Sequence, residues 1–185
     1  MKLLKIILIL FISLITLVKA DSKKNIIENL KVGGKLIFIR HAYAPGGGDP
    51  ENFNIYDCST QRNLSESGRI QSRKIGNFFK ENKIKIENVY SSEWCRCKET
   101  ASLAFENFKT KSFLNSFFSL KFAQNKNSQM RDFQKFLLDW DEKTNLIFVT
   151  HYVVISEALN YAPSSGEIVI SDKKFNIIGT FKTNY

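Results

Sequence analysis

The chain has 185 residues, of which 43% are hydrophobic, and this suffices for one domain with a sizeable core. Its formal net charge of +9 raises the question of a nucleic-acid partner. However, the lysines are scattered, no run of four basic residues occurs, and lysines outnumber arginines 21 to 6. We therefore interpret the charge as solvated surface and expect no nucleic-acid partner.

Residues 1–20 have the pattern of a secretory signal peptide. Lys2 and Lys5 give a positive start, an apolar run follows over 6–18, and Ala20 is a small residue at a suitable cleavage position. The apolar run is shorter than the roughly 20 residues that span a bilayer. We predict a signal peptide over 1–20, a single domain over 21–185, export to the periplasm if the source is a bacterium, and no membrane span after cleavage. An uncleaved N-terminal anchor is the alternative.

The rest of the sequence alternates predicted helices and strands. In chain order we expect a short helix over 22–32, a strand over 35–40, a long polar loop over 41–64, a helix over 65–82, a short strand that starts after 84 and ends at 91–92, a helix over 93–108, a short strand and loop over 113–120, a helix over 127–143, a strand over 146–150, a helix over 152–160, and closing strands over 167–170 and 175–181. This alternation indicates an α/β fold with a mostly parallel sheet.

Two of the predicted strands end in a similar way. The apolar run 36–39 leads into Arg40 and His41, and the run 146–150 leads into His151, although the chain has only two histidines. In open α/β sheets, ligands bind beyond the carboxyl ends of the strands. If the two strands are neighbours, their ends lie about 5 Å apart.

Further arginines lie close to these strand ends in the predicted topology. Arg96 is in the first turn of the helix that follows the second strand, and Arg62 is in the long loop. Such a cluster of cations is repulsive when empty and suits a doubly charged phosphoryl group, which arginine binds bidentately. An imidazole can attack phosphorus and hold the phosphoryl group as phosphohistidine.

Four blocks of the sequence resemble the histidine phosphatase superfamily, the phosphoglycerate mutase-like proteins. Arg40-His41-Ala42 is similar to the family's Arg-His-Gly motif, and 91–101 is similar to its Ser-Ser-x-x-x-Arg-Ala-x-x-Thr-Ala segment. Val149-Thr150-His151 resembles the second histidine block, and 64–69 resembles the Leu-(Thr/Ser)-x-x-Gly turn. The resemblance extends from about 35 to 181. It implies a three-layer α/β/α sandwich with a mostly parallel central sheet, and an enzyme that needs no metal or other cofactor.

The resemblance also implies a role for each matching residue. His41 would be the nucleophile that becomes phosphorylated, and His151 would complete the pocket around the transferring group. Arg40 and Arg96 would clamp the phosphoryl oxygens. Arg62 would be a further phosphate or substrate contact.

The family's general-acid Glu is missing from this sequence. Where many members read Leu-Asn-Glu, this chain reads Leu114-Asn115-Ser116. A proton donor typically contributes 10²–10⁴-fold to such a reaction. Three explanations stay open: another carboxylate serves as the acid, the leaving group is already good, or turnover is slow. Among the carboxylates, we expect Asp49 to serve as the acid, slightly ahead of Asp57. The alternative for Asp49 is that it only caps a turn before Pro50.

The three cysteines allow one disulfide in an exported protein. Cys58 can pair with Cys95 or with Cys97, and three reduced thiols are an equal alternative.

These observations predict an exported phosphatase that hydrolyses a small-molecule or envelope phosphomonoester through a phosphohistidine intermediate on His41. The first alternative is a catalytically weak phosphate- or phosphosugar-binding envelope protein with the same pocket. A second is a structural or interaction protein of the envelope. The sequence leaves the physiological substrate and the oligomeric state open.

Overall fold

A computed structural model of the chain describes residues 24–183. The signal peptide predicted over 1–20 lies outside the described residues. Within 24–183, none of the helices has both the length and the apolar character needed to cross a membrane.

The centre of the fold is a six-stranded sheet with strand order β3-β2-β4-β1-β5-β6. The strands are β1 (Leu36–Arg40), β2 (Asn88–Ser91), β3 (Lys109–Thr110), β4 (Leu146–Thr150), β5 (Ile168–Ser171) and β6 (Ile177–Phe181). The four strands from β3 to β1 in this order pair in parallel, whereas β5 and β6 are antiparallel to their neighbours. The predicted α/β fold with a mostly parallel sheet is thus confirmed.

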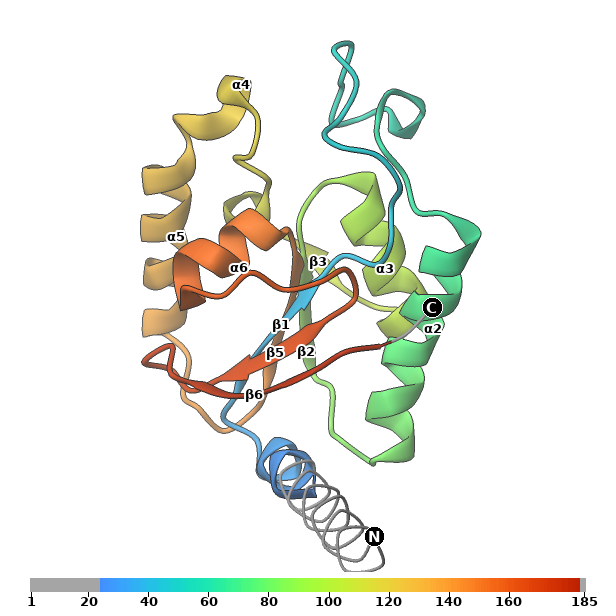
Figure 1. Ribbon diagram of the computed structural model, residues 1–185. Helices are drawn as coiled ribbons and strands as arrows, with labels where there is room; N and C mark the ends of the chain where they lie inside the picture. The colour runs from blue at the N-terminus through green and yellow to red at the C-terminus, as the bar shows by residue number, and fades with distance from the viewer. Residues whose placement is uncertain (1–23, 184–185) are drawn as a thin grey trace, which may run out of the picture.

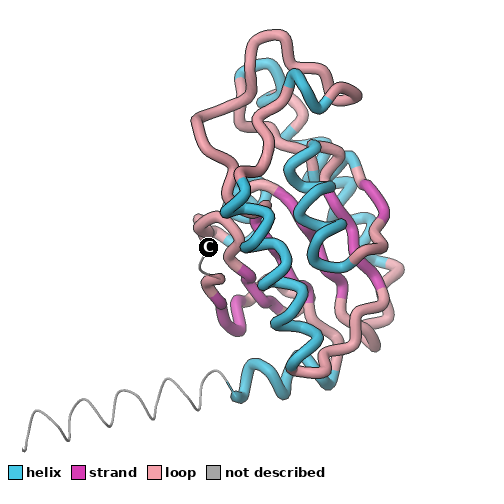
Figure 2. Tube along the Cα trace, turned by 90° about the vertical axis from the view of Figure 1, so that its right-hand side faces the viewer, coloured by secondary structure: helices cyan, strands magenta, loops and turns pink. Residues whose placement is uncertain are grey.

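Helices cover both faces of the sheet and give three layers (Figures 1 and 2). The helices are 24–32, α2 (Glu66–Glu81), α3 (Cys95–Phe105), α4 (Leu120–Ala123), α5 (Lys126–Leu138) and α6 (Tyr152–Leu159), with short 3-10 helices η1 (Cys58–Thr60) and η2 (Ser112–Leu114). Side chains alternate along β1, so that Ile37 and Ile39 pack toward α2 and α3 while Leu36 and Phe38 pack toward α5 and α6. Burial on both faces explains why β1 and β4 are continuous apolar runs.

The pairing of β1 with β4 places the two histidines at one edge of the sheet. The register joins Leu36 to Leu146 and Arg40 to Thr150, so that His41 and His151 leave the sheet side by side. The loop 41–64 projects from this same end, opposite the helix 24–32 (Figures 1 and 2). The condition stated above for the two histidines to lie close together, that these strands are neighbours, is therefore met.

The turn into α2 is packed against the backbone that follows β1. Ser65 caps the helix by accepting a hydrogen bond from the Gly68 N–H at 3.1 Å. A Cβ atom at Gly68 would lie 2.1 Å from the Tyr43 carbonyl oxygen. Gly68, the glycine of the Leu-(Thr/Ser)-x-x-Gly turn, is therefore required because the start of α2 lies so close to the backbone at Tyr43.

Three predicted elements differ from the structure. The prediction of a strand within 113–120 is wrong, because Phe113 and Leu114 are buried in the 3-10 helix η2. The strand at this edge of the sheet is β3, which precedes η2 in the chain. A short apolar run cannot distinguish a strand from a buried irregular segment. The third helix ends at Phe105, because Glu106 adopts a positive φ of 63°. The helix expected up to 143 ends at Leu138.

A disulfide joins Cys58 in η1 to Cys95 at the start of α3. Cys97 is a buried free thiol, and burial raises its pKa to about 12. Two positions along a helix are separated by about 200°, so Cys95 and Cys97 point in different directions. The bridge fastens the loop beside Arg96.

Candidate active site

His41 is a neutral imidazole whose unprotonated nitrogen is Nε2. Its backbone N–H donates to the Thr150 carbonyl at 2.9 Å, which continues the β1–β4 pairing by one residue. Its Nδ1 lies 2.8 Å from the Ala42 carbonyl oxygen. A carbonyl only accepts, so Nδ1 carries the proton and Nε2 accepts from Arg96 Nε at 3.3 Å. Burial, followed by the charge of Arg96, lowers the pKa of His41 well below 6.5.

His151 faces His41 from the beginning of α6. The two ring centroids are 5.4 Å apart, with the ring planes at 68°. His151 Nε2 lies 2.9 Å from Ser92 Oγ, which donates to Asn115 Oδ1 at 3.0 Å. Because the Ser92 hydroxyl has one proton, His151 Nε2 is the donor to Ser92. Burial, followed by the charge of Arg96, also lowers the pKa of His151 well below 6.5.

We expect the stability of the fold to fall as the pH drops below 6.5. In the unfolded chain both histidines take up protons near 6.5, whereas burial keeps them neutral in the folded state. In this window each histidine removes up to about 1.4 kcal/mol of unfolding free energy per pH unit. Urea unfolding across this range should show a smaller pH slope for His151→Gln than for the wild type. An equal slope would contradict the assignment.

Arg96 forms a bidentate ion pair with Asp49. Its two terminal nitrogens lie 2.7 and 3.1 Å from the two carboxylate oxygens, and Arg96 itself is 2% exposed. Asp49 also accepts from Trp94 Nε1 and from the backbone N–H of Arg62, each at 3.0 Å. Burial alone would raise the pKa of Asp49, but the hydrogen bonds and charge of Arg96 outweigh it and lower the pKa. Asp49 is therefore ionised.

Arg40 and Arg62 add two more guanidinium groups. Arg40 donates to the Pro163 carbonyl at 2.8 Å and lies 5.3 Å from the centre of the Tyr152 ring. Arg62 donates to the Ala44 carbonyl. The Nε of each arginine is buried, without a hydrogen-bond partner among the described residues. Buried unsatisfied donors are costly and favour a ligand that accepts hydrogen bonds.

The charges of this cluster match a phosphomonoester dianion. Both histidines are neutral, and three guanidinium groups face one carboxylate, which leaves a net charge of about +2. Arg96 is buried and Arg40 and Arg62 are half-buried, so an excess of this size is unfavourable unless an anion neutralises it. The arrangement can therefore bind a doubly charged anion next to the His41 lone pair.

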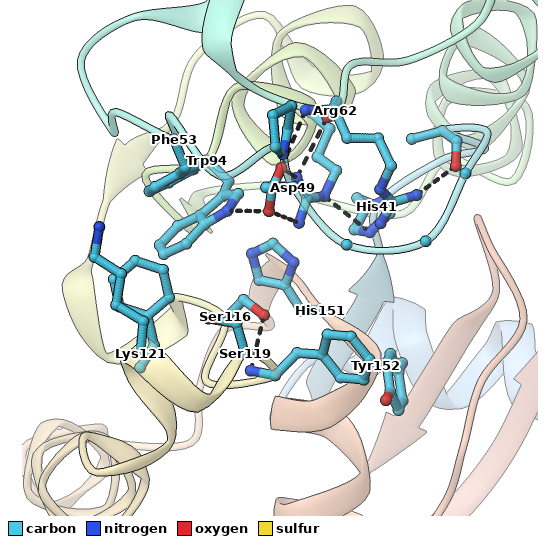
Figure 3. A pocket seen from close by; sticks show the side chains of 18 of the residues that line it. His41, Asp49, Phe53, Arg62, Trp94, Ser116, Ser119, Lys121, His151 and Tyr152 are labelled. Atoms are coloured by element: carbon cyan, nitrogen blue, oxygen red, sulfur yellow. Dashed lines mark hydrogen bonds and ion pairs between the residues drawn. The ribbon is translucent and has the colours of Figure 1, made fainter.

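A cavity of about 720 Å³ brings the predicted site residues together (Figure 3). All six line it: Arg40, His41, Asp49, Arg62, Arg96 and His151. Ser116 also lines the cavity, where its hydroxyl accepts from the Phe118 N–H at 3.3 Å. Within 24–183, no group of three or more His, Cys, Asp or Glu side chains is placed to hold a metal ion.

The structure separates the two carboxylates considered as general acids. Asp57 is exposed and outside the cavity lining, where it caps η1 through the Ser59 N–H and O–H. Asp49 is inside the cavity, but its ionised state opposes proton donation. The role of Asp49 as the acid stays a prediction. Its contacts with Arg96 are more than the turn cap that the sequence offered as an alternative.

Sequence reasoning missed two side chains that shape this site. Trp94 buries its ring at the start of α3, and its Nε1 donates a hydrogen bond to Asp49. Gln61 is 5% exposed, accepts from the Cys95 N–H at 2.9 Å and donates to loop carbonyls. The sequence around Gln61 and Trp94 does not indicate these roles. Their contacts with Cys95 and Asp49 join segments that are far apart in the chain.

The fold and this pocket define an α/β protein with a two-histidine anion pocket at the carboxyl end of its parallel strands. A family model described as Histidine phosphatase superfamily (branch 1) matches residues 36–115, which assigns this part of the chain to that superfamily. The resemblance inferred from the motifs is thus confirmed. A search of curated proteins finds no match.

Solved structures share this fold at low sequence identity. The protein TTHB049 from Thermus thermophilus is 14% identical with a TM-score of 0.57, covering 82% of this chain and 97% of its own. The protein histidine phosphatase SixA, complexed with tungstate, is 16% identical with a TM-score of 0.53, covering 77% and 92%. Rv3214 from Mycobacterium tuberculosis is 15% identical with a TM-score of 0.56, covering 81% and 96%. These similarities establish the phosphoglycerate mutase-like fold.

Proposed function

We propose that this protein hydrolyses phosphomonoesters in two steps, with His41 Nε2 as the nucleophile. In the first step Nε2 attacks phosphorus, a P–N bond forms, and the P–O bond to the leaving group breaks with its electron pair. In the second step water attacks phosphorus, the P–N bond breaks, and inorganic phosphate leaves. The observation that carries this proposal is the neutral His41, whose Nε2 contacts the buried Arg96 beside the half-buried Arg40 and Arg62.

The other residues have roles that follow from their positions. Arg96 and Arg40 would neutralise the phosphoryl oxygens, and Arg62 would add a third positive charge at the cavity. His151, with its proton on Nε2 directed at Ser92, would present a neutral imidazole to the transferring group. When a phosphoryl group binds to Arg96, at least one of the two hydrogen bonds from Arg96 to Asp49 must break.

The competing function is phosphate binding without turnover. Ser116, where a carboxylic acid is expected, favours this alternative, because a poor leaving group needs a proton. A structural neighbour is named a protein histidine phosphatase, and the imidazole released from phosphohistidine is a better leaving group than an alkoxide. Phosphohistidine is therefore one of the substrates to be tested.

Turnover of 4-nitrophenyl phosphate tests the proposal against its alternative. We expect the purified chain to release nitrophenol from this monoester but not from bis(4-nitrophenyl) phosphate, because the diester cannot present a dianion to the arginine cluster. Tungstate, an oxyanion of similar charge, should inhibit competitively. Tungstate binding without hydrolysis of the aryl ester or of phosphohistidine would instead establish a binding protein.

We also propose that the protein is exported. The sequence pattern of residues 1–20 and the Cys58–Cys95 disulfide support this, because disulfides persist mainly in oxidising compartments.

A further inference from the structure

The cavity over the histidines is far larger than a phosphoryl group and is bounded by aromatic side chains. Its volume is about 720 Å³, and the phosphoryl group needs only the part beside His41 and the arginines. The remaining space must receive whatever the phosphoryl group is attached to. The side chains that border it therefore report on the leaving group.

One side of the cavity is an aromatic wall, the Trp94 wall, formed by Phe53, Trp94 and Phe122. Phe53 stacks on Trp94 at a centroid distance of 4.9 Å, and Phe122 packs edge-on against both at 5.6 and 5.5 Å. Trp94 also contacts the His151 ring, with the centroids 5.4 Å apart. The wall thus begins at a residue of the phosphate site and extends away from it.

A second wall, the Tyr152 wall, is formed by Phe118 and Tyr152. Their ring centroids are 5.8 Å apart, and the Arg40 guanidinium lies over the Tyr152 ring. Figure 3 shows Trp94 and Tyr152 on either side of His151. Since each wall contacts a residue of the phosphate site, a group attached to the phosphoryl lies between the two walls.

Two apolar side chains that line this charged cavity are exposed. Phe118 is 56% exposed and Leu120 is 95% exposed. Apolar surface that is exposed at a pocket commonly marks the face that a ligand covers. This feature argues for an apolar leaving group over a polar one such as a sugar.

The chemistry of the site also restricts the leaving group, because neither Ser116 nor Asp49 is suited to donate a proton to it. Ser116 lies where a proton donor is expected, and Asp49 is ionised by Arg96. A leaving alkoxide needs a proton, whereas a phenol has a pKa of about 10 and leaves as its anion far more readily. A leaving group that is both apolar and able to depart unprotonated is an aromatic alcohol.

Building on the proposed function, we infer that the pocket selects aryl phosphomonoesters, with the aromatic ring held between the Trp94 wall and the Tyr152 wall. The P–N bond to His41 forms as the P–O bond breaks, and the electron pair remains on the phenolate oxygen, which solvent later protonates. Rings prefer stacked or edge-on contacts with other rings. Trp94 itself is only 3% exposed, so the ring surface open to a substrate is that of the half-buried Phe53 and Phe122 in one wall and of Phe118 and Tyr152 in the other. The aryl group can belong to a small molecule or to a phosphotyrosine side chain.

The test compares kcat/KM for phenyl phosphate, acetyl phosphate and hexyl phosphate. Acetyl phosphate has a good leaving group without a ring, and hexyl phosphate is apolar but has a poor leaving group. We expect phenyl phosphate to exceed both by about tenfold or more. Phosphotyrosine, free and within a peptide, serves as a further pair of aryl substrates that distinguishes the two sources.

Variants at the cavity mouth separate ring recognition from leaving-group ability. Phe118→Ala should lower the phenyl-to-acetyl ratio of kcat/KM by about tenfold, and Leu120→Ala by less. Leu138→Ala is the matched control, since Leu138 is 75% exposed at the end of α5 and outside the cavity lining; it should change neither rate. All three side chains are exposed, so folding is not at risk.

The two proposals fail in distinguishable ways. If acetyl phosphate equals phenyl phosphate, or if Phe118→Ala lowers both rates by the same factor, the aryl preference is wrong while hydrolysis stands. If no monoester is hydrolysed, the proposed function is wrong as well.

Discussion

Replacing His41 by alanine is expected to lower kcat/KM for an aryl phosphate by about 10⁴-fold or more, because the variant loses the unprotonated Nε2 that contacts Arg96. The change removes a neutral ring, so the charge of the pocket is preserved. We therefore expect tungstate to bind to the variant with little loss of affinity. Measuring both hydrolysis and tungstate affinity separates loss of the nucleophile from collapse of the pocket.

A His41→Ala protein that binds tungstate and retains more than a small fraction of its hydrolysis would contradict this assignment, because another nucleophile would then be required. Thermal unfolding should accompany the assay, because the buried ring and its hydrogen bond to Ala42 are lost together. A folded variant with the wild-type rate would exclude His41 from the reaction.

The second large effect is expected at Arg96, which serves both the pocket and the fold. Arg96→Met should lower kcat/KM by about 10³-fold, since the guanidinium that contacts His41 Nε2 is lost. It should also lower the free energy of unfolding by about 3 kcal/mol, because the Asp49 carboxylate would remain mostly buried without its partner. Activity assays and urea unfolding of the same preparation measure the two effects.

Arg69→Met is the matched control for this experiment. Arg69 pairs with Glu99 at 2.7 Å, the same distance as the Arg96–Asp49 pair, but both side chains are about one-third exposed. Exposed ion pairs contribute little to stability because solvent screens them, so the loss of this pair should be small and activity unchanged. If both substitutions destabilised the fold equally, the claim that the buried Arg96–Asp49 pair contributes more to stability than the exposed Arg69–Glu99 pair would be contradicted.

Asp49→Asn distinguishes two roles for this carboxylate. Four of the five Arg96 N–H groups are engaged, and Asp49 holds two of them. If Asp49 competes with the phosphoryl group, the variant should bind tungstate more tightly. If Asp49 is the general acid, the variant should slow substrates with poor leaving groups more than those with good ones.

The sequence predicted the residues that carry the chemistry better than it predicted the contacts that position them. Apolar runs ending in Arg40-His41 and in His151 predicted which strands carry the site, because a buried strand has a clear pattern and its polar end stands out. The pairing of Asp49 with Arg96 joins residues far apart in the chain. No periodicity links them, so this contact required the folded structure.

The failures of prediction have similar physical causes. Phe113 was assigned to a strand because buried 3-10 turns and strands are equally apolar. The disulfide partner of Cys58 depended on the rotation of α3, which sequence spacing alone did not fix. A buried tryptophan such as Trp94 has the sequence pattern of a core residue, and only the fold shows that its Nε1 donates to Asp49 in the site.

Rapid quenching of the enzyme during turnover of an aryl phosphate shows whether His41 carries the phosphoryl group. We expect a phosphoenzyme that survives alkali and is lost in acid, with mass spectrometry placing the phosphoryl group on His41. The same experiment on His41→Ala should give no phosphoenzyme. An acid-stable phosphoserine, or turnover without any phosphoenzyme on His41, would contradict the mechanism.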